Sequence, residues 1–247
     1  MEKGSVIGTG NTAVVYQWEE GKVLKLFHPG YSEEVVDREF SNTVIVNPMK
    51  FNKPKTYGKL IYEGQYGIIY DRIDGESLLD RVLATKDLEM CTDYLAGLHK
   101  EILANTSTDI PDYKDFLRYH IQESAFLAFE EKEKMLKLLH KLPEGKTLCH
   151  GDFHPGNVII SGGKAIAIDF MNVCRGNYLY DIARTVYLVQ YTPVPDIGGD
   201  REQLLALKQT LADRYLEKMG VDRELIQDYL TVIAVARKAE CPGETIN

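Results

Sequence analysis

The sequence predicts an α+β protein in which strands and helices occupy separate parts of the chain. Short apolar runs around glycines dominate about the first seventy residues, whereas amphipathic helical patterns dominate the rest. The change occurs at Ile73–Gly75, where strand character stops at an Asp-Gly pair typical of turns. We therefore expect a small β-rich N-lobe, residues 1–73, and a larger, mainly α-helical C-lobe, residues 74–247.

The expected N-lobe begins with strands separated by glycines and contains one helix. Val23–Phe27 alternates between two faces and carries Lys25 in its middle. Ser32 precedes two glutamates, which is typical of a helix N-terminus, and this helix contains Glu39. The expected strands lie at residues 4–18, 23–27, 55–64 and 66–69, and the expected helix at residues 32–46.

The expected C-lobe is helical apart from one β-hairpin. The apolar runs Val158–Ile160 and Ala165–Ile168 flank Gly162 and Gly163, and a glycine pair tolerates the positive φ of a two-residue turn. The expected helices lie at residues 77–82, 87–102, 180–190, 200–219 and 222–238, and a long helical region is expected over residues 115–141.

This hairpin brings oxygen-bearing side chains together. With the turn at residues 162–163, Asn157 lies opposite Ile168, and Asp169 follows directly along the chain. Asp152 precedes the hairpin on a short loop. Two carboxylates and an amide oxygen in one place suit a hard cation such as Mg²⁺, with one carboxylate left over as a base.

A second group of residues indicates phosphate binding. The segment GTGNTA contains Gly8 and Gly10, and it continues as a strand, so it lacks the helix that a dinucleotide-binding fingerprint requires. A strand–turn–strand unit lays backbone N–H groups over phosphates, although a plain hairpin turn is the alternative. Lys25 is costly to bury unless its ammonium meets an anion; the alternative is a solvent-facing lysine. With Glu39 nearby, we expect Lys25 to hold phosphate oxygens and Glu39 to orient it.

Several motifs carry a resemblance to a known family. These are HGDFHPGNV at residues 150–158, AIDF at 167–170, DIAR at 181–184, IIYDRIDGESL at 68–78 and LAGLH at 95–99. Together they closely resemble the aminoglycoside phosphotransferase/choline kinase-like family. The resemblance implies a bilobal protein-kinase-like fold. It also implies a kinase that uses ATP and Mg²⁺ to move the γ-phosphoryl group onto a hydroxyl of a small molecule.

The resemblance also implies individual roles. Asp152 becomes the catalytic base, and Asn157 and Asp169 the ligands of Mg²⁺. Asp181 becomes a structural residue that braces the catalytic loop through hydrogen bonds. The residues implied in nucleotide binding are Gly8, Gly10 and Val15 of the glycine loop, Lys25 and Glu39 at the phosphates, and the backbone of Asp71 and Ile73 at the adenine.

Two departures from protein kinases favour a small acceptor. Asp169 is followed by Phe170-Met171 instead of the kinase Phe-Gly, and no extended activation segment precedes Gly176. An atypical protein serine/threonine kinase and a nucleotide-binding pseudokinase scaffold remain alternatives. We expect the acceptor pocket within residues 181–238, where Tyr187 and Tyr191 either wall a cationic substrate or pack as an ordinary helix face.

Composition sets limits on partners and location. The 247 residues carry a net charge of −8, which argues against non-specific nucleic-acid binding but permits a local nucleotide site. The four cysteines are scattered without a C-x-x-C pair, as expected of reduced thiols. The start, MEKGSVIGTG, lacks a signal-peptide segment, and no apolar run reaches bilayer-spanning length. We expect a cytoplasmic protein whose partner is a small hydroxyl compound, not nucleic acid or a membrane.

Overall fold

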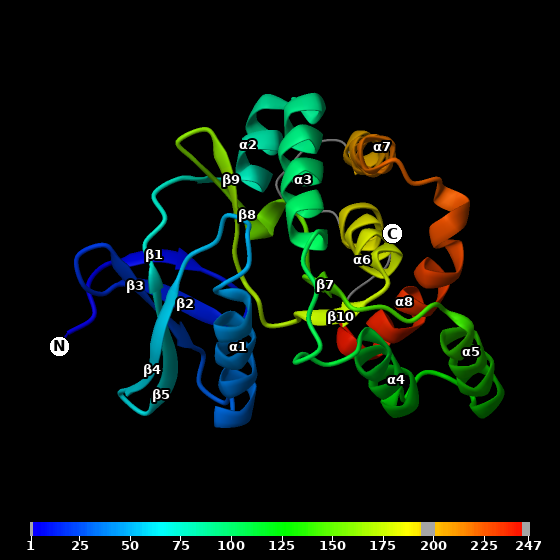
Figure 1. Cartoon of the computed structure of the whole chain (residues 1–247), viewed down its shortest axis with the longest axis horizontal. Helices are drawn as coiled ribbons and strands as arrows, with labels where there is room; N and C mark the ends of the chain where they lie inside the picture. Colours follow the sequence, from blue (N-terminus) through cyan, green and yellow to red (C-terminus); the bar gives the residue numbers. More distant parts are fainter. Residues whose placement is uncertain (1, 194–200, 244–247) are drawn as a thin grey trace.

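The computed structural model describes residues 2–193 and 201–243, and all structural statements refer to these residues. The largest β-sheet lies in one lobe and most of the helices in the other, as the sequence predicts (Figure 1). None of the described helices combines the length and apolar character needed to cross a lipid bilayer.

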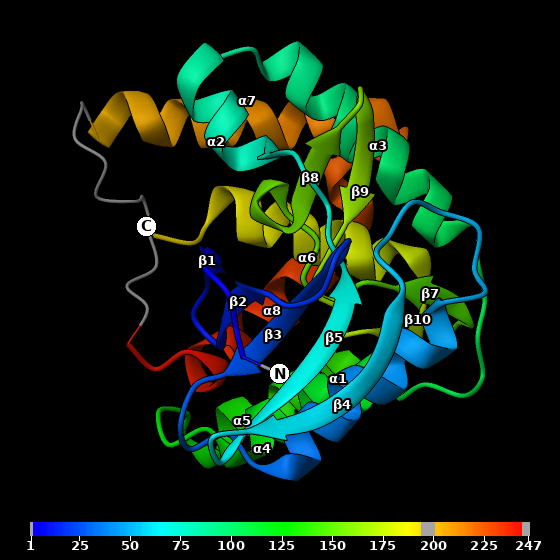
Figure 2. The ribbon, with the colours of Figure 1, turned by 90° about the vertical axis from the view of Figure 1, so that its left-hand side faces the viewer.

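The N-lobe is a five-stranded antiparallel sheet with the order β1-β2-β3-β5-β4. A single helix, α1, packs against β4 and β5, and Figure 2 looks onto the sheet with α1 behind it. A small apolar cluster that includes Phe27, Val36 and Ile68 fills the space between sheet and helix. The elements are β1 (Val6–Thr9), β2 (Ala13–Gln17), β3 (Lys22–Phe27), α1 (Glu33–Val46), β4 (Thr56–Tyr62) and β5 (Gln65–Asp71).

The C-lobe packs its helices around α6, whose residues Tyr180–Val189 are all buried. Helices α7 and α8 pack directly on α6, while α3 packs on α7 and α4 packs on α8. A helix that is buried on all sides is usually apolar around its whole circumference. Asp181 and Arg184 of α6 are charged and nevertheless buried, so each needs a hydrogen-bonding or oppositely charged partner. The helices are α2 (Leu78–Thr85), α3 (Leu88–Leu103), α4 (Tyr113–Glu123), α5 (Phe129–Lys141), α6 (Tyr178–Gln190), α7 (Arg201–Met219) and α8 (Gln227–Glu240).

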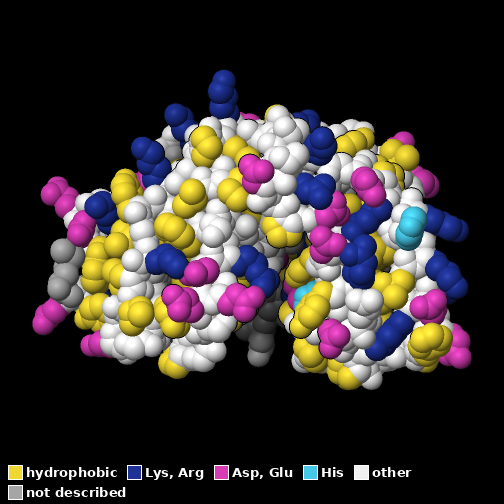
Figure 3. Space-filling view, turned by 60° about the horizontal axis from the view of Figure 1, so that its bottom comes forward, with side chains coloured by type: hydrophobic (Ala, Val, Ile, Leu, Met, Phe, Trp, Pro, Cys, Tyr) yellow, Lys and Arg dark blue, Asp and Glu magenta, His cyan; other side chains and the backbone are white. Residues whose placement is uncertain are grey.

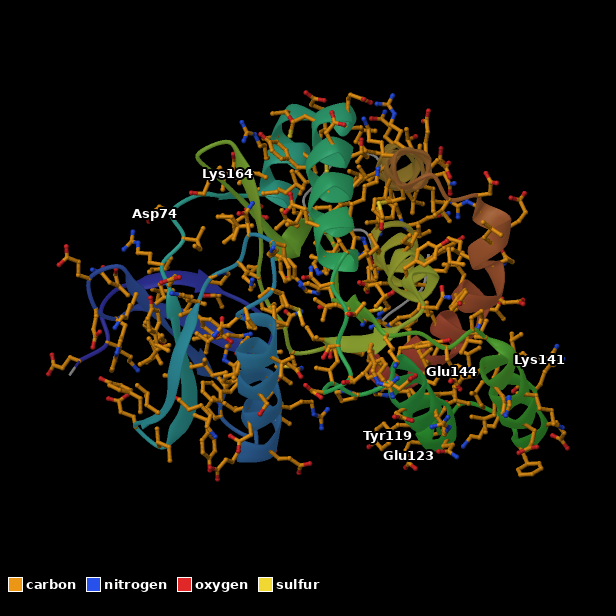
Figure 4. The ribbon with its side chains drawn as sticks, viewed as in Figure 1. Asp74, Tyr119, Glu123, Lys141, Glu144 and Lys164 are labelled. Carbon is orange, nitrogen blue, oxygen red and sulfur yellow. The ribbon has the colours of Figure 1, made fainter. Side chains whose placement is uncertain are left out.

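Short strands carry the segment between α5 and α6. A hairpin of two strands pairs Ile159 with Ile166 and Ser161 with Lys164, which confirms the predicted register. The hydroxyl of Ser161 donates to the carbonyl of Asp74 at 2.6 Å and fastens the lobe connection to the hairpin turn; Asp74 and Lys164 are labelled in Figure 4. The strands are β6 (Glu76–Ser77), β7 (Thr147–Cys149), β8 (Val158–Ser161), β9 (Lys164–Ala167) and β10 (Cys174–Gly176), with a 3₁₀ turn at Pro155–Asn157.

The helical region expected over residues 115–141 is present, but the sequence did not indicate that it consists of two helices. Helices α4 and α5 are separated by a break at residues 124–128. The Ser124 hydroxyl accepts from the N–H of Phe126, and the Glu131 carboxylate accepts from the N–H of Ala128, so side chains replace the lost helical bonds. Strands β6, β7 and β10 were not predicted, because two or three residues are too short to show alternation.

The remaining expected elements are present within a few residues of their predicted limits. The final expected helix starts with a 3₁₀ turn, Arg223–Ile226, and α8 then continues to Glu240. The lobe boundary at residues 73/74 stays a prediction, and it falls in the connection between β5 and β6.

Candidate active site

The loop that follows β7 is held in one conformation by a glycine with positive φ and by hydrogen bonds to α6. Gly151 has φ +76°, a left-handed conformation that favours glycine, and a Cβ there would lie 2.1 Å from the Asn172 carbonyl oxygen. Asp181 of α6 accepts hydrogen bonds from the backbone N–H groups of His150 (2.6 Å) and Gly151 (2.9 Å). The predicted bracing of the loop by Asp181 is therefore observed.

The three predicted oxygen-bearing residues converge at the base of the hairpin. The Asn157 amide Nδ2 donates to the Asp152 carbonyl oxygen at 2.8 Å and lies 3.3 Å from its Oδ2. The N–H of Ile168 donates to the Asn157 carbonyl at 3.0 Å, which places Asp169 beside this pair. Asp169 itself has φ +65°, a conformation uncommon for a residue other than glycine.

Lys25 joins the two lobes through an ion cluster. Its Nζ lies 2.8 and 2.9 Å from the two carboxylate oxygens of Glu39 on α1, which confirms the predicted pairing. The same Nζ lies 3.2 Å from Asp169 Oδ1, a contact that spans 144 positions of sequence and was not predicted. The Tyr70 hydroxyl donates to Glu39 at 2.8 Å and so fixes the buried carboxylate from the other side.

One ammonium facing two carboxylates sets the electrostatics of this cluster. Burial opposes charge on Lys25, but Asp169 and Glu39 raise its pKa above the usual lysine value. Burial likewise opposes charge on Asp169, and Lys25 nevertheless holds the pKa of that carboxyl below its ordinary value. Burial raises the pKa of Glu39, which shares the ammonium and lies deepest. Lys25 therefore stays cationic and Asp169 stays anionic at neutral pH.

The donor set at the hairpin fits a hard cation. The Asn157 amide nitrogen faces Asp152, which leaves its Oδ1 for a metal ion, and Asp169 supplies an ionised carboxylate. Among residues 2–193 and 201–243, no group of three or more His, Cys, Asp or Glu side chains is arranged to hold a metal.

Further polar side chains support the site, and sequence reasoning missed them. Asn42 of α1 donates from Nδ2 to the carbonyls of Phe170 and Met171, both at 3.0 Å, and so ties the N-lobe helix to the segment after Asp169. His99 Nε2 donates to Asp181 at 2.9 Å, and the Tyr215 hydroxyl lies 2.5 Å from His99 Nδ1. A buried asparagine or histidine on an amphipathic helix is the only sequence signal for either contact.

The expected nucleotide residues lie along the N-lobe sheet. Gly8 lies in β1 and Gly10 in the following turn, where its N–H donates to the Ala13 carbonyl at 2.9 Å. Val15 of β2 is the cross-strand partner of Lys25 on β3. At the other edge, Asp71 ends β5 and Ile73 follows it; these two belong to the connection between the lobes.

Tyr187 of α6 and Tyr191, the residue just after the helix, pack against each other. Tyr187 is buried, and its ring lies 5.6 Å from that of Tyr191 between centroids. The packing alternative for this pair is therefore favoured over a substrate-binding wall. The expected acceptor region also includes residues 194–200, which lie outside the described part of the chain.

Comparisons with known proteins place the fold. A stretch of 81 residues is 30% identical to the amicoumacin kinase of Bacillus subtilis, covering 32% of this chain and only 24% of that protein. The aminoglycoside phosphotransferase of Streptomyces rimosus with ADP and streptomycin gives a TM-score of 0.61 at 15% identity, covering 90% of both chains. An amicoumacin kinase with AMP-PNP and Ca²⁺ gives 0.59 at 15% identity, covering 96% of this chain and 79% of the other.

These likenesses confirm the expected bilobal protein-kinase-like fold. The model of a family described as "phosphotransferase enzyme family" matches residues 3–220, which is most of the chain. The chain thus belongs to the phosphotransferase enzyme family.

Proposed function

We propose that this protein is a small-molecule kinase that transfers the γ-phosphoryl group of ATP to a hydroxyl of its acceptor. The observation that carries the proposal is the convergence of Asp152, Asn157 and Asp169 at one end of the hairpin, with the Lys25 ammonium 3.2 Å from Asp169. A base, a hard-cation site and a phosphate-binding cation in one place are the parts that phosphoryl transfer requires.

Each residue of this set has a distinct task. Asp152 accepts or orients the proton of the acceptor hydroxyl, because its carboxylate is the one not engaged by Lys25. Asn157 and Asp169 would hold Mg²⁺, which supplies charge neutralisation at the β- and γ-phosphates when bound. Lys25, oriented by Glu39, binds the α- and β-phosphate oxygens.

The nucleotide would lie under the N-lobe sheet. Gly8, Gly10 and Val15 cover it, and the backbone of Asp71 and Ile73 meets the adenine. The N–H of Asp71 already donates to the Lys55 carbonyl at 2.9 Å, so a contact with the base at Asp71 uses its carbonyl oxygen. The ADP and AMP-PNP held by the two structural relatives support the binding of an adenine nucleotide by this chain.

The acceptor is a small hydroxyl compound in this proposal. The relatives act on or bind streptomycin and amicoumacin, which favours a small molecule over the atypical protein kinase and the pseudokinase scaffold. Positive and negative side chains are intermixed over the face in Figure 3. Proteins that bind nucleic acid instead present a continuous basic patch. A cytoplasmic location without a membrane or nucleic-acid partner remains part of the proposal.

The test replaces the proposed base. We expect Asp152→Ala to lower kcat by at least about a hundredfold while Mg·ATP binding is retained, because the metal and phosphate ligands are untouched. Asp80→Ala, on an exposed carboxylate of α2, is the control and keeps full activity. A mass-spectrometric panel of hydroxyl compounds, including streptomycin and choline, identifies the acceptor first. Unchanged turnover in Asp152→Ala would refute the assignment.

A further inference from the structure

Arg184 is a fully buried guanidinium beneath the loop that carries Asp152. It is 0% exposed, and it belongs to α6. Its Nη2 lies 2.7 and 2.8 Å from the two carboxylate oxygens of Glu240, and its Nε donates to the carbonyl of Gly151 at 3.2 Å. Arg237 adds a second cation 3.0 Å from Glu240 Oε1. A guanidinium buried in this way persists only because these acceptors compensate it.

Gly151 is clamped by α6 on both of its backbone polar groups. Its N–H donates to Asp181 Oδ1 at 2.9 Å, and its carbonyl accepts from Arg184 Nε. Asp181 and Arg184 are three residues apart, so both side chains point from the same face of the helix. The Gly151 carbonyl belongs to the peptide bond that leads to Asp152. Arg184 therefore fixes the orientation of the peptide that carries the proposed base.

The anchor of this arrangement comes from the last helix. Glu240 is the final residue of α8, which lies alongside α6 and α4 in Figure 1. The family match ends at residue 220, so the carboxylate that holds Arg184 lies beyond the matched region. Burial opposes charge on both partners, yet each supports the other: Glu240 raises the pKa of Arg184, and Arg184 with Arg237 lowers that of Glu240.

We propose that Arg184 and Glu240 are positioning residues for phosphoryl transfer, with α8 acting through them as a brace for the catalytic loop. Glu240 holds the guanidinium in place, Arg184 holds the Gly151 carbonyl, and this peptide aims Asp152. The inference rests on the proposed function for its catalytic consequence, whereas the bracing of the loop is independent of it.

Two variants separate this role from general stability. Glu240→Gln keeps the size of the side chain but removes the charge that holds Arg184, and Arg184→Lys keeps the charge but removes the fork. The matched control is Val232→Ala, which deletes methyl groups from a fully buried, apolar position of the same helix, α8, and leaves both charges of the ion pair in place. All three variants are compared in the full chain, below their Tm values.

Amide hydrogen exchange measures how firmly the catalytic loop is held, and it needs no acceptor substrate. We expect amides of residues 149–157 to exchange faster in Glu240→Gln and Arg184→Lys than in Val232→Ala. Equal exchange in all three variants would overturn the proposal. Hydrogen exchange tests the bracing of the loop even if the wild-type chain phosphorylates no compound of the panel. Such a lack of activity would count against the proposed function and not against the bracing.

Steady-state kinetics then measure the effect of the brace on catalysis, with the panel compound that the wild type phosphorylates as the acceptor. We expect kcat to fall about tenfold in Glu240→Gln and Arg184→Lys, because small misplacements of a base are costly. KM for Mg·ATP should stay within about twofold, since the nucleotide residues are untouched. A loss of kcat no larger than in Val232→Ala, or a change confined to KM, would refute the positioning role.

Discussion

Replacing Gly151 by alanine tests whether the loop before Asp152 depends on one close backbone approach. Gly151 has φ +76°, and a Cβ would lie 2.1 Å from the Asn172 carbonyl oxygen. Gly163, in the hairpin turn, has φ +75°, and a Cβ there would meet no atom of the described residues within 4 Å. Gly151→Ala and Gly163→Ala therefore share the cost of a left-handed alanine, about 1 kcal/mol, and differ only in the clash.

The clash sets the magnitude of the difference. A carbon and an oxygen need roughly 3.2 Å, so the loop and the Asn172 peptide have to separate by about 1 Å. Such overpacking costs about 1–3 kcal/mol beyond the shared term, and a displacement of about 1 Å beside a catalytic group lowers kcat about a hundredfold.

The assay compares the two alanine variants with the wild type by urea unfolding and by kcat. We expect Gly163→Ala to lose about 1 kcal/mol of the free energy of unfolding and to keep its activity, since its turn is open. Gly151→Ala should lose about 2–4 kcal/mol and most of its turnover. The reasoning is refuted if Gly151→Ala matches Gly163→Ala in both stability and kcat.

Two further substitutions test the charged contacts. Glu39→Gln removes the charge 2.8 Å from Lys25 and leaves the ammonium to Asp169, so kcat/KM for Mg·ATP should fall about 10- to 100-fold; a value within threefold of the wild type would contradict this. Asp181→Asn tests linkage. Burial opposes the negative charge of Asp181, but the hydrogen bond from His99 holds the pKa of this carboxyl below its ordinary value. The ionised carboxylate therefore stabilises the folded chain at pH values above the pKa of Asp181 in the unfolded chain. This stabilisation is lost as the pH falls through the lower pKa of Asp181 in the folded chain. The deficit of Asp181→Asn in the free energy of unfolding should be constant from pH 7 to 5 and shrink below about pH 4; urea unfolding that shows the same deficit at pH 3.5 would disprove it.

Contacts within one local unit were predictable from the sequence. The glycine pair at residues 162–163 sets the hairpin register, and this register places Asn157 next to Asp169. The glycine-rich turn before Lys25 and the helical Glu39 after it indicated the pairing of these two residues, which the structure confirms. Such patterns succeed because a turn or a helix end is determined by residues a few positions apart.

The sequence did not indicate features that leave no pattern in the residues next to them. The helical composition of residues 115–141 concealed the break between α4 and α5, which depends on Ser124 and Glu131 satisfying freed N–H groups. Strands β7 and β10 form by pairing two segments that are distant in the sequence, with Cys149 opposite Cys174, and neither segment shows a period by itself.

The sequence alone determined the division into a strand-rich and a helical part, the hairpin register and the family to which the chain belongs. Tertiary structure alone decided two contacts of buried charges that the sequence did not indicate. Lys25 reaches Asp169 across 144 positions, and Arg184 reaches Glu240 across 56. The physical reason is that burying a charge demands a compensating group, while which distant side chain supplies it depends on how whole helices and sheets pack.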